Sequence, residues 1–183
     1  MYSLFDSLID NLTNSWKTPH APRSKRAYRC QCDRPVFFRN SQCLACEAPL
    51  GYEPTPGEVR TLHPGVARDT WRLTGDGTTK RNYRRCANFE SAAGCNWLVP
   101  EDDSMTHCVA CRLNRTIPDL GDSDNRRYWR AMEVAKRRLV SQLLALGLPV
   151  EPKTQNPEKG LAFDMMPSAR RSERNCMSPI EHL

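Results

Sequence analysis

The sequence predicts a small α+β protein in which short β-hairpins are followed by one long amphipathic α-helix. Three observations support this fold class. Eight cysteines lie in two groups of four between Cys30 and Cys111, and short apolar runs separate members of each group. A long stretch with apolar residues at helical spacing then runs from about Asp124 to Leu146.

The eight cysteines have the spacing of metal-binding turns. The first group is Cys30-Gln-Cys32 and, ten residues later, Cys43-Leu-Ala-Cys46; the second ends in Cys108-Val-Ala-Cys111. Thiolates two or three positions apart can bind one soft ion from a tight turn, and four thiolates complete the tetrahedral shell of Zn²⁺. The sequence therefore predicts two structural Zn²⁺ ions. The expected ligands are Cys30, Cys32, Cys43 and Cys46 at the first site and Cys86, Cys95, Cys108 and Cys111 at the second.

Spacing alone leaves the grouping of these ligands open. Sequential sites would each use four consecutive cysteines, whereas a cross-brace would join the first pair to the third and the second to the fourth. We favour sequential sites, because the long segment between Cys46 and Cys86 loses less entropy when each site closes locally.

Disulfide bonds are the main alternative use of so many cysteines. Residues 1–16 carry Asp6 and Asp10 and lack the basic start and long apolar run of a secretory signal. No stretch approaches the ~20 apolar residues of a membrane span. We therefore expect a location in the reducing cytoplasm, where close cysteine pairs more often bind metal than form disulfides. The ninth cysteine, Cys176, is expected to be a free thiol.

The composition indicates a modest core and a basic surface. Counted with glycine and without tyrosine, the apolar fraction is roughly 41%, below the ~45–50% of typical domains. Each zinc site should therefore matter for folding, since its binding free energy is on the order of 10 kcal/mol. The formal charge of the 183 residues is +6, and two four-thiolate zinc sites would lower it to about +2.

Two basic clusters, Lys17–Arg34 and Arg126–Arg138, remain after this correction. They favour either contact with nucleic acid or a solvated charged surface, and the sequence leaves both readings open. The candidate contact residues on the predicted helix are Arg126, Arg127, Arg130, Arg137 and Arg138.

Changes in composition along the chain divide it into six segments. We expect an N-terminal extension and linker at 1–27, a first zinc ribbon at 28–52, a connecting segment at 53–82, a second four-cysteine zinc unit at 83–120, a helical segment at 121–165 and a disordered tail at 166–183.

Local patterns within the two zinc units predict short strands. Val36-Phe37-Phe38 is a β run between the two cysteine pairs of the first unit, and cysteine turns joined by a hairpin make a zinc ribbon. Residues 51–80 are rich in proline, glycine and threonine and predict a long connection with turns, docked by Trp71. We expect His63 and the acidic run Glu101-Asp102-Asp103 to be solvent-exposed rather than metal ligands or acid–base groups.

The helix is predicted from about Asp124 to Leu146, capped by Ser123 or Asp124 and ended by Gly147. Its arginines lie mostly opposite an apolar stripe, so we expect the stripe to face the core and Glu133 to pair with Arg137. The stripe consists of Tyr128, Met132, Ala135, Leu139, Leu143 and Leu146, widened by Trp129 and Val140.

Ordered motifs between Tyr28 and Asp164 point to one family. They are Cys-Gln-Cys at 30–32, Asn-Ser-Gln-Cys-Leu-Ala-Cys at 40–46, Leu-Gly-Tyr at 50–52, Arg-Arg-Cys-Ala-Asn at 84–88, Cys-Asn-Trp-Leu-Val-Pro at 95–100, Cys-Arg-Leu-Asn-Arg-Thr-Ile-Pro-Asp-Leu at 111–120, Ala-Lys-Arg-Arg-Leu-Val at 135–140, Leu-Gly-Leu-Pro at 146–149 and Gly-Leu-Ala-Phe-Asp at 160–164. In this order they resemble the bacterial "putative zinc-binding metallopeptidase" family with an N-terminal zinc ribbon. The resemblance implies structural zinc at all eight cysteines.

The sequence also departs from that family. Glu47 stands where the family usually has glycine, which predicts a strained turn, and residues 1–27 have no counterpart. Family members continue beyond the Gly-Leu-Ala-Phe-Asp segment into a helix with His-Glu-x-x-His, in which two histidines bind Zn²⁺ and the glutamate activates water. None of the four histidines here begins such a motif. We therefore expect no peptidase activity. We also expect that the chain was shortened by a frameshift or an early stop, or that it is a genuine short form.

The leading hypothesis is a cytoplasmic, non-catalytic zinc-ribbon protein that resembles the N-terminal region of a zinc metallopeptidase. The alternatives are a nucleic-acid-binding zinc-ribbon module, and a protein-interaction adaptor that docks through apolar residues near Trp16 or Trp129.

Overall fold

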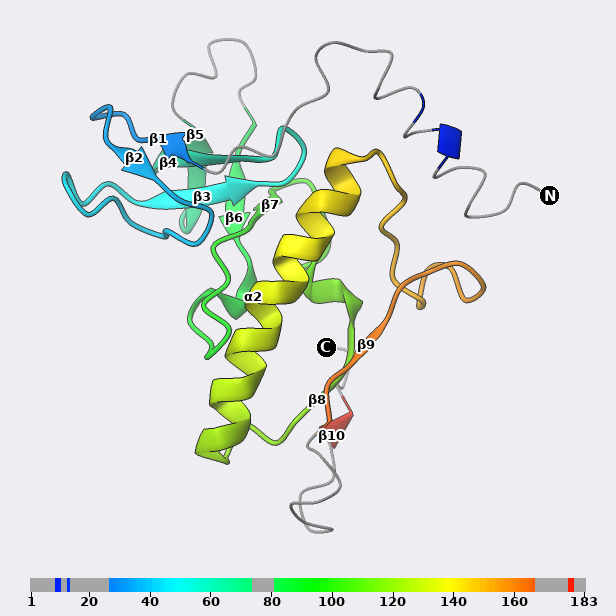
Figure 1. Cartoon of the computed structure of the whole chain (residues 1–183). Coiled ribbons are helices and arrows are strands. Elements are labelled where there is room, and N and C mark those ends of the chain that lie inside the picture. The colour runs from blue at the N-terminus through cyan, green and yellow to red at the C-terminus, as the bar shows by residue number, and fades with distance from the viewer. Residues whose placement is uncertain (1–8, 11–12, 14–26, 74–80, 167–177, 180–183) are drawn as a thin grey trace.

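A long helix, α2 (Ser123–Ala145), runs beside a group of antiparallel strands (Figure 1). This computed structural model describes residues 9–10, 13, 27–73, 81–166 and 178–179. The N-terminal extension and the tail expected at 1–27 and 166–183, together with Cys176, lie largely outside the described residues. Mixed strand and helix content agrees with the predicted α+β class.

Five antiparallel strands form the largest sheet and follow one another in chain order. They are β3 (Leu50–Glu53), β4 (Glu58–Pro64), β5 (Thr70–Leu73), β6 (Tyr83–Arg85) and β7 (Leu98–Pro100). The sheet nearly closes on itself, because the Tyr52 amide donates to the Asn96 carbonyl and Tyr52 forms a bridge with Trp97 just before β7. The expectation of simple hairpins is therefore wrong, since consecutive hairpins have merged into one curved sheet.

Two of these strands lie in the segment that we expected to be an irregular connection. β4 buries Val59, Thr61 and Leu62, and Gly57, with φ of +69°, makes the tight turn that leads into it. The prolines and glycines around β4 and β5 belong to the turns between strands, and they obscured the strand pattern in the sequence. Trp71 does dock as predicted: its ring packs beside the buried cluster of β4, β5 and β6.

The first zinc unit adds a two-stranded hairpin, β1 (Tyr28–Arg29) and β2 (Pro35–Val36), in which Tyr28 pairs with Val36. The β run predicted at Val36-Phe37-Phe38 is thus a strand only at its start. Phe37 is exposed, whereas the Phe38 ring packs edge-on against Tyr52, with ring centroids 4.7 Å apart. Phe38 therefore ties the first zinc unit to the closure of the sheet.

The chain after the second zinc unit forms a small third sheet. β8 (Asn114–Ile117) pairs in parallel with β9 (Phe163–Asp164) and antiparallel with β10 (Ser178–Pro179). Asp164 accepts hydrogen bonds from Arg115 Nε at 3.0 Å and Thr116 Oγ1 at 2.8 Å. These two donors, the arginine first, lower the pKa of Asp164 to about 2 and hold β9 on β8.

The bounds of α2 agree closely with the sequence. Asp122, one residue earlier than predicted, caps the helix: its Oδ1 accepts from the amides of Asp124 at 2.7 Å and Asn125 at 3.1 Å. Gly147 ends the helix with φ of +68°, as predicted. Within the described part of the chain, no helix is long and apolar enough to cross a membrane.

The faces of α2 are not the predicted ones. Tyr128, Met132 and Leu139 of the apolar stripe are 51%, 46% and 43% exposed, so the expectation that this stripe faces the core is wrong for them. The side chains that α2 buries are Trp129, Glu133, Lys136, Arg137, Val140 and Ser141. The expectation of a solvated Arg137 is wrong for the same reason, and Trp129 is itself buried.

Ion pairing explains this orientation. Glu133 lies 2.6 Å from Lys136 Nζ and 3.7 Å from Arg137 Nη1, so three charges that would each resist burial are buried together. The pairing of Glu133 with Arg137 was predicted, but its burial was not. The helix therefore turns Glu133, Lys136 and Arg137 towards the interior. Tyr128, Met132 and Leu139 are left at the surface.

Candidate metal centres

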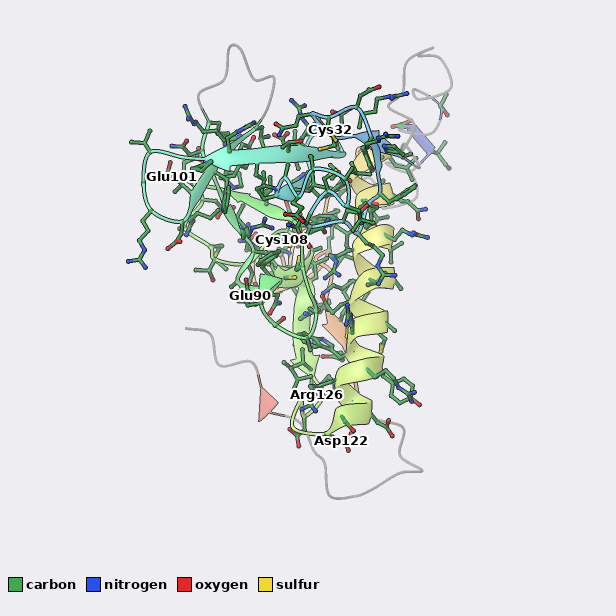
Figure 2. The ribbon with its side chains drawn as sticks, turned by 90° about the vertical axis from the view of Figure 1, so that its left-hand side faces the viewer. Cys32, Glu90, Glu101, Cys108, Asp122 and Arg126 are labelled. Carbon is green, nitrogen blue, oxygen red and sulfur yellow. The ribbon has the colours of Figure 1, made fainter. Side chains whose placement is uncertain are left out.

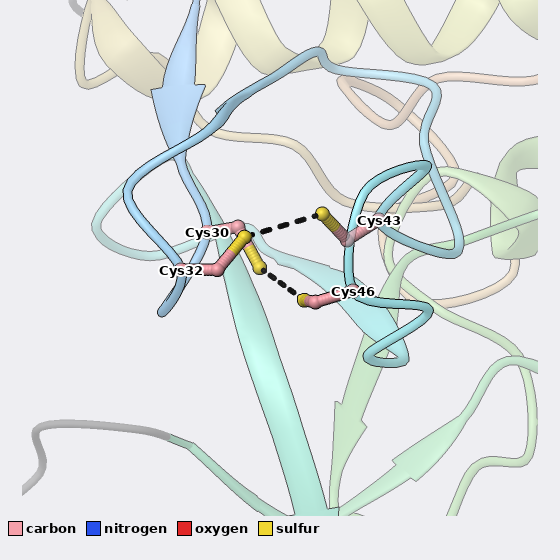
Figure 3. Close-up of side chains that lie close together, drawn as sticks. All are labelled: Cys30, Cys32, Cys43 and Cys46. Atoms are coloured by element: carbon pink, nitrogen blue, oxygen red, sulfur yellow. Dashed lines mark hydrogen bonds between the residues drawn. The ribbon is translucent and has the colours of Figure 1, made fainter.

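The first site is built from two tight turns that face each other. In the first turn the Cys30 amide donates to the Arg34 carbonyl and the Asp33 amide to the Cys30 carbonyl, both at 2.9 Å. Asp33 has φ of +64°, a left-handed conformation that aspartate tolerates better than most residues. This turn places Cys30 and Cys32 on the same side of the chain (Figure 3).

The second turn of this site runs from Cys43 to Ala48. The Cys43 amide donates to the Ala48 carbonyl and the Glu47 amide to the Cys43 carbonyl, again at 2.9 Å. Glu47 has φ of +57°. Glutamate thus occupies a left-handed position that suits glycine, which is the strain predicted from the sequence.

The four sulfurs of the first site have the separations of a zinc shell. All lie within 4.8 Å of one another, with Cys30 to Cys46 at 3.6 Å and Cys32 to Cys43 at 3.7 Å (Figure 3). A tetrahedron with Zn–S bonds of about 2.3 Å has edges of about 3.8 Å. The donor set therefore fits Zn²⁺. Cys30 and Cys43 are buried, whereas Cys32 and Cys46 are exposed.

The second site gathers its ligands from the end of β6, the loop before β7 and the segment that leads into a following 3₁₀ turn. Cys86 comes directly after β6, and its amide donates to the Trp97 carbonyl at 3.1 Å. Cys108 donates its own amide to Cys86 Sγ at 3.3 Å, and Cys111 opens the turn Cys111–Leu113. Cys95 and Cys108 sulfurs are 3.7 Å apart, and all four sulfurs lie within 4.8 Å of one another. This donor set also fits Zn²⁺.

The two sites differ in their surroundings. All four cysteines of the second site are buried, whereas half of the first site faces solvent. Cys32 lies near one end of the molecule and Cys108 closer to its middle (Figure 2). The second site is therefore the better protected of the two.

This geometry settles the alternatives that spacing left open. Each site uses four consecutive cysteines, so the grouping is sequential. The sulfur separations of 3.6–3.7 Å are far longer than the ~2.05 Å of a disulfide bond. His107 belongs to neither sulfur cluster, and its Nδ1 lies 3.4 Å from Thr106 Oγ1.

Hydrogen bonding prepares some of these thiols to ionise. At the first site the backbone amides of Cys46 and Ala45 lower the pKa of Cys43 to about 6. At the second site hydrogen bonding with Cys108 is the largest effect that lowers the pKa of Cys111, to about 7. Within the same two clusters the pKa of Cys46 is raised to about 12 and those of Cys95 and Cys108 are raised above the ordinary thiol value, so the thiols of each site differ in how readily they give the thiolates that bind zinc.

The acidic run near the second site has a structural explanation. Asp102 forms an ion pair with Arg81 at 3.0 Å, Asp103 forms one with Arg112, and Glu101 accepts from Asn82 Nδ2 at 2.7 Å. Glu101 lies at the edge of the molecule on the side opposite α2 (Figure 2). These contacts join the loop to the two residues before β6 and to the Cys111–Leu113 turn, and none of the three acids belongs to a sulfur cluster.

The candidate nucleic-acid contacts divide into two groups. Arg126, Arg127, Arg130 and Arg138 are exposed, and Arg126 lies at the start of α2 near Asp122 (Figure 2). Arg137 is buried and donates from Nη2 to the Ala93 carbonyl at 3.0 Å. Arg137 therefore cannot belong to such a surface, and residues 17–26 of the other basic cluster lie outside the described residues.

Sequence reasoning missed the polar side chains that contact the second site from outside. Glu133 Oε2 lies 3.8 Å from Cys111 Sγ, and Glu133 Oε1 accepts from Asn114 Nδ2 at 3.0 Å. Burial raises the pKa of Glu133. The only signal in the sequence was the run of Glu133, Lys136 and Arg137 at helical spacing, which equally suits an exposed face.

Zinc should leave the first site before the second. Cys32 and Cys46 are open to a chelator, whereas every ligand of the second site is buried. Excess EDTA added to the loaded protein, with released zinc followed by an indicator dye, should give two phases of one ion each. Cys32→Ser should abolish the fast phase and Cys108→Ser the slow one; a fast phase that survives Cys32→Ser would contradict this assignment.

Replacing Glu47 with glycine should stabilise the loaded protein by about 0.5–1 kcal/mol. A left-handed backbone costs an L residue roughly 1–2 kcal/mol, and the greater freedom of glycine in the unfolded chain offsets about 0.5–1 kcal/mol of the gain. Urea unfolding with excess zinc measures the difference. Glu90, an exposed glutamate with φ of −83°, is the control, since Glu90→Gly should only destabilise. Equal losses from both substitutions would contradict strain at Glu47.

Comparison with known proteins agrees with this geometry. The zinc-ribbon domain family matches residues 27–122, more than half of the chain, and the family described as "Putative zinc-binding metallo-peptidase" matches residues 125–179. Uncharacterised proteins of Mycobacterium bovis and of two strains of Mycobacterium tuberculosis are 32% identical over 148 residues. These residues are 80% of this chain and 39% of each relative, so the chain spans about two fifths of the length of those proteins. No solved structure gives a significant match. The chain belongs to the zinc-ribbon domain family, and the segment that follows its ribbon domain is similar to the family described as "Putative zinc-binding metallo-peptidase".

Proposed function

We propose that the chain acts as a structural zinc module that holds the first helix of the peptidase-family region and does not itself cleave peptide bonds. The observation that carries this proposal is the composition of the two sites. Each brings four sulfurs within 4.8 Å of one another. Four thiolates fill the tetrahedral shell of Zn²⁺ and leave no position for a water molecule.

Peptide hydrolysis by zinc has different requirements. A catalytic zinc keeps one coordination position open for water, and the zinc peptidase motif supplies two histidines one helical turn apart with a glutamate as base. The 183 residues contain no His-Glu-x-x-His. The residues present here therefore support a structural role for both ions, in which zinc binding contributes directly to folding.

The position of α2 supports the second half of the proposal. The match to the zinc-ribbon family ends at residue 122 and the match to the peptidase family starts at residue 125, close to the first residue of α2. Glu133 and Arg137 of α2 contact Cys111 and the Ala93 carbonyl of the ribbon domain. The ribbon domain would thus provide the platform on which the peptidase-family region begins.

We further propose that the protein works in the cytoplasm, since a reducing compartment keeps eight thiols available for metal. We also propose that the chain is divided into six segments with boundaries at residues 27, 52, 82, 120 and 165. Limited proteolysis of the loaded protein would test those boundaries.

The purified protein should contain two zinc ions per chain and should not hydrolyse casein. Elemental analysis by mass spectrometry measures the metal, and release of labelled casein fragments measures hydrolysis. Cys108→Ser, which removes one ligand of the second site only, should reduce the content to one zinc ion. Casein hydrolysis that disappears on chelation and returns with zinc would contradict the proposed non-catalytic role.

A further inference from the structure

Four polar side chains, three from α2 and one from β8, form a buried cluster that contacts Cys111 of the second zinc site. Glu133, Lys136 and Arg137 are 0%, 3% and 3% exposed, and Asn114 at the start of β8 is also buried. Lys136 Nζ donates to Glu133 Oε1 at 2.6 Å and to Asn114 Oδ1, while Asn114 Nδ2 donates to Glu133 Oε1 at 3.0 Å. The cluster meets the zinc site where Glu133 Oε2 lies 3.8 Å from Cys111 Sγ.

The charges of this cluster do not balance by themselves. Glu133 carries one negative charge, and Lys136 and Arg137 carry one positive charge each, which leaves an excess of one positive charge. Among the ion pairs of the described residues, Glu133 is the acidic partner of both cations. Arg137 Nη1 is buried and has no hydrogen-bond partner in the part of the chain that the structure describes. A buried unpaired charge is strongly destabilising, so this excess calls for another anion nearby.

The loaded second site supplies such an anion. Four thiolates and one Zn²⁺ carry a net charge of −2, and all four sulfurs are buried, so water does not screen that charge. Lys136 and Arg137 supply the opposite charge within the same interior. At the first site Cys32 and Cys46 face solvent, and water can offset the charge of the metal complex there.

We infer that Lys136 and Arg137 are the counter-charges of the second zinc site, and that zinc in this site is what holds α2 on the ribbon domain. This inference rests on the proposed structural zinc. Glu133 is the positioning residue: it contacts Cys111 and forms ion pairs with both cations. Because coupling between two binding events is reciprocal, cations that favour zinc binding also make bound zinc favour the docked helix.

The first test compares zinc release from variants of the full chain. Lys136→Met should accelerate the slow phase of release to EDTA, which belongs to the second site, by about 10- to 100-fold, the range by which loss of a group behind the ligands weakens metal binding. The fast phase of the first site is an internal control and should not change. Lys136→Arg keeps the charge and should restore slow release, and Arg138→Met, which removes an exposed arginine of the same helix, should have no effect.

A pair of variants separates this role from simple neutralisation of Glu133. If Lys136 served only Glu133, then Lys136→Met made in a Glu133→Gln background would leave the slow phase unchanged. If Lys136 balances the zinc site, the double variant should still release this zinc about tenfold faster than Glu133→Gln alone. Equal slow phases in the two proteins would overturn the inference.

A measurement on the wild-type protein avoids any effect of substitution on folding. Hydrogen exchange of α2 amides should stay unchanged after the fast phase, when only the first site has lost zinc. After the slow phase, exchange should accelerate about tenfold or more. Protection of α2 that survives loss of the second zinc would overturn the inference and leave the proposed function intact. A protein that binds no zinc at all would instead refute the proposed function.

Discussion

Coordination of zinc by two sets of four thiolates is the interaction on which the rest of this fold depends. The two sites hold turns that the chain cannot stabilise with apolar contacts alone: Cys30 and Cys43 at the first site, and all four ligands at the second, are part of one core cluster with Trp97 and Leu113. Without metal these positions would bury six thiols that make only weak hydrogen bonds. The nearly closed sheet and the long helix both pack against the core cluster that contains these cysteines.

The two zinc sites hold different parts of the chain together. The first, with its exposed sulfurs, fixes the β1–β2 hairpin to the sheet, and Phe38 completes that attachment by packing on Tyr52. The second is enclosed by β6, β7, the Cys111–Leu113 turn and α2. A difference in exposure alone therefore separates a site open to competing ligands from one that is part of the interior.

The sequence predicted the metal centres well and the packing of the helix poorly. Ligand spacing identified the eight cysteines. Their sequential grouping was favoured because closing each site locally costs less entropy than ordering the long segment between Cys46 and Cys86. The bounds of α2 followed to within one residue from the polar residues at its start and from Gly147 at its end. Its buried face did not, because hydrophobic periodicity assigns Tyr128 and Met132 to the core and cannot register that Glu133 and Lys136 find partners there. Likewise β4 was hidden because the prolines and glycines of its flanking turns dominate the local composition.

Strain and charge mark where this chain departs from the simplest zinc ribbon. Glu47 keeps a left-handed turn that glycine would adopt freely, and the buried row on α2 replaces apolar contacts by ion pairs beside a metal complex. Both features lower the free energy of unfolding, and the binding free energy of zinc offsets that loss.

The two donor sets imply that sulfur alone holds both ions. X-ray absorption at the zinc K edge of the loaded protein measures this directly, because it reports the number and type of atoms around the metal. Four sulfur neighbours per zinc at about 2.3 Å are expected. A first shell that contains nitrogen or oxygen neighbours would mean that at least one site is open, and would contradict this expectation.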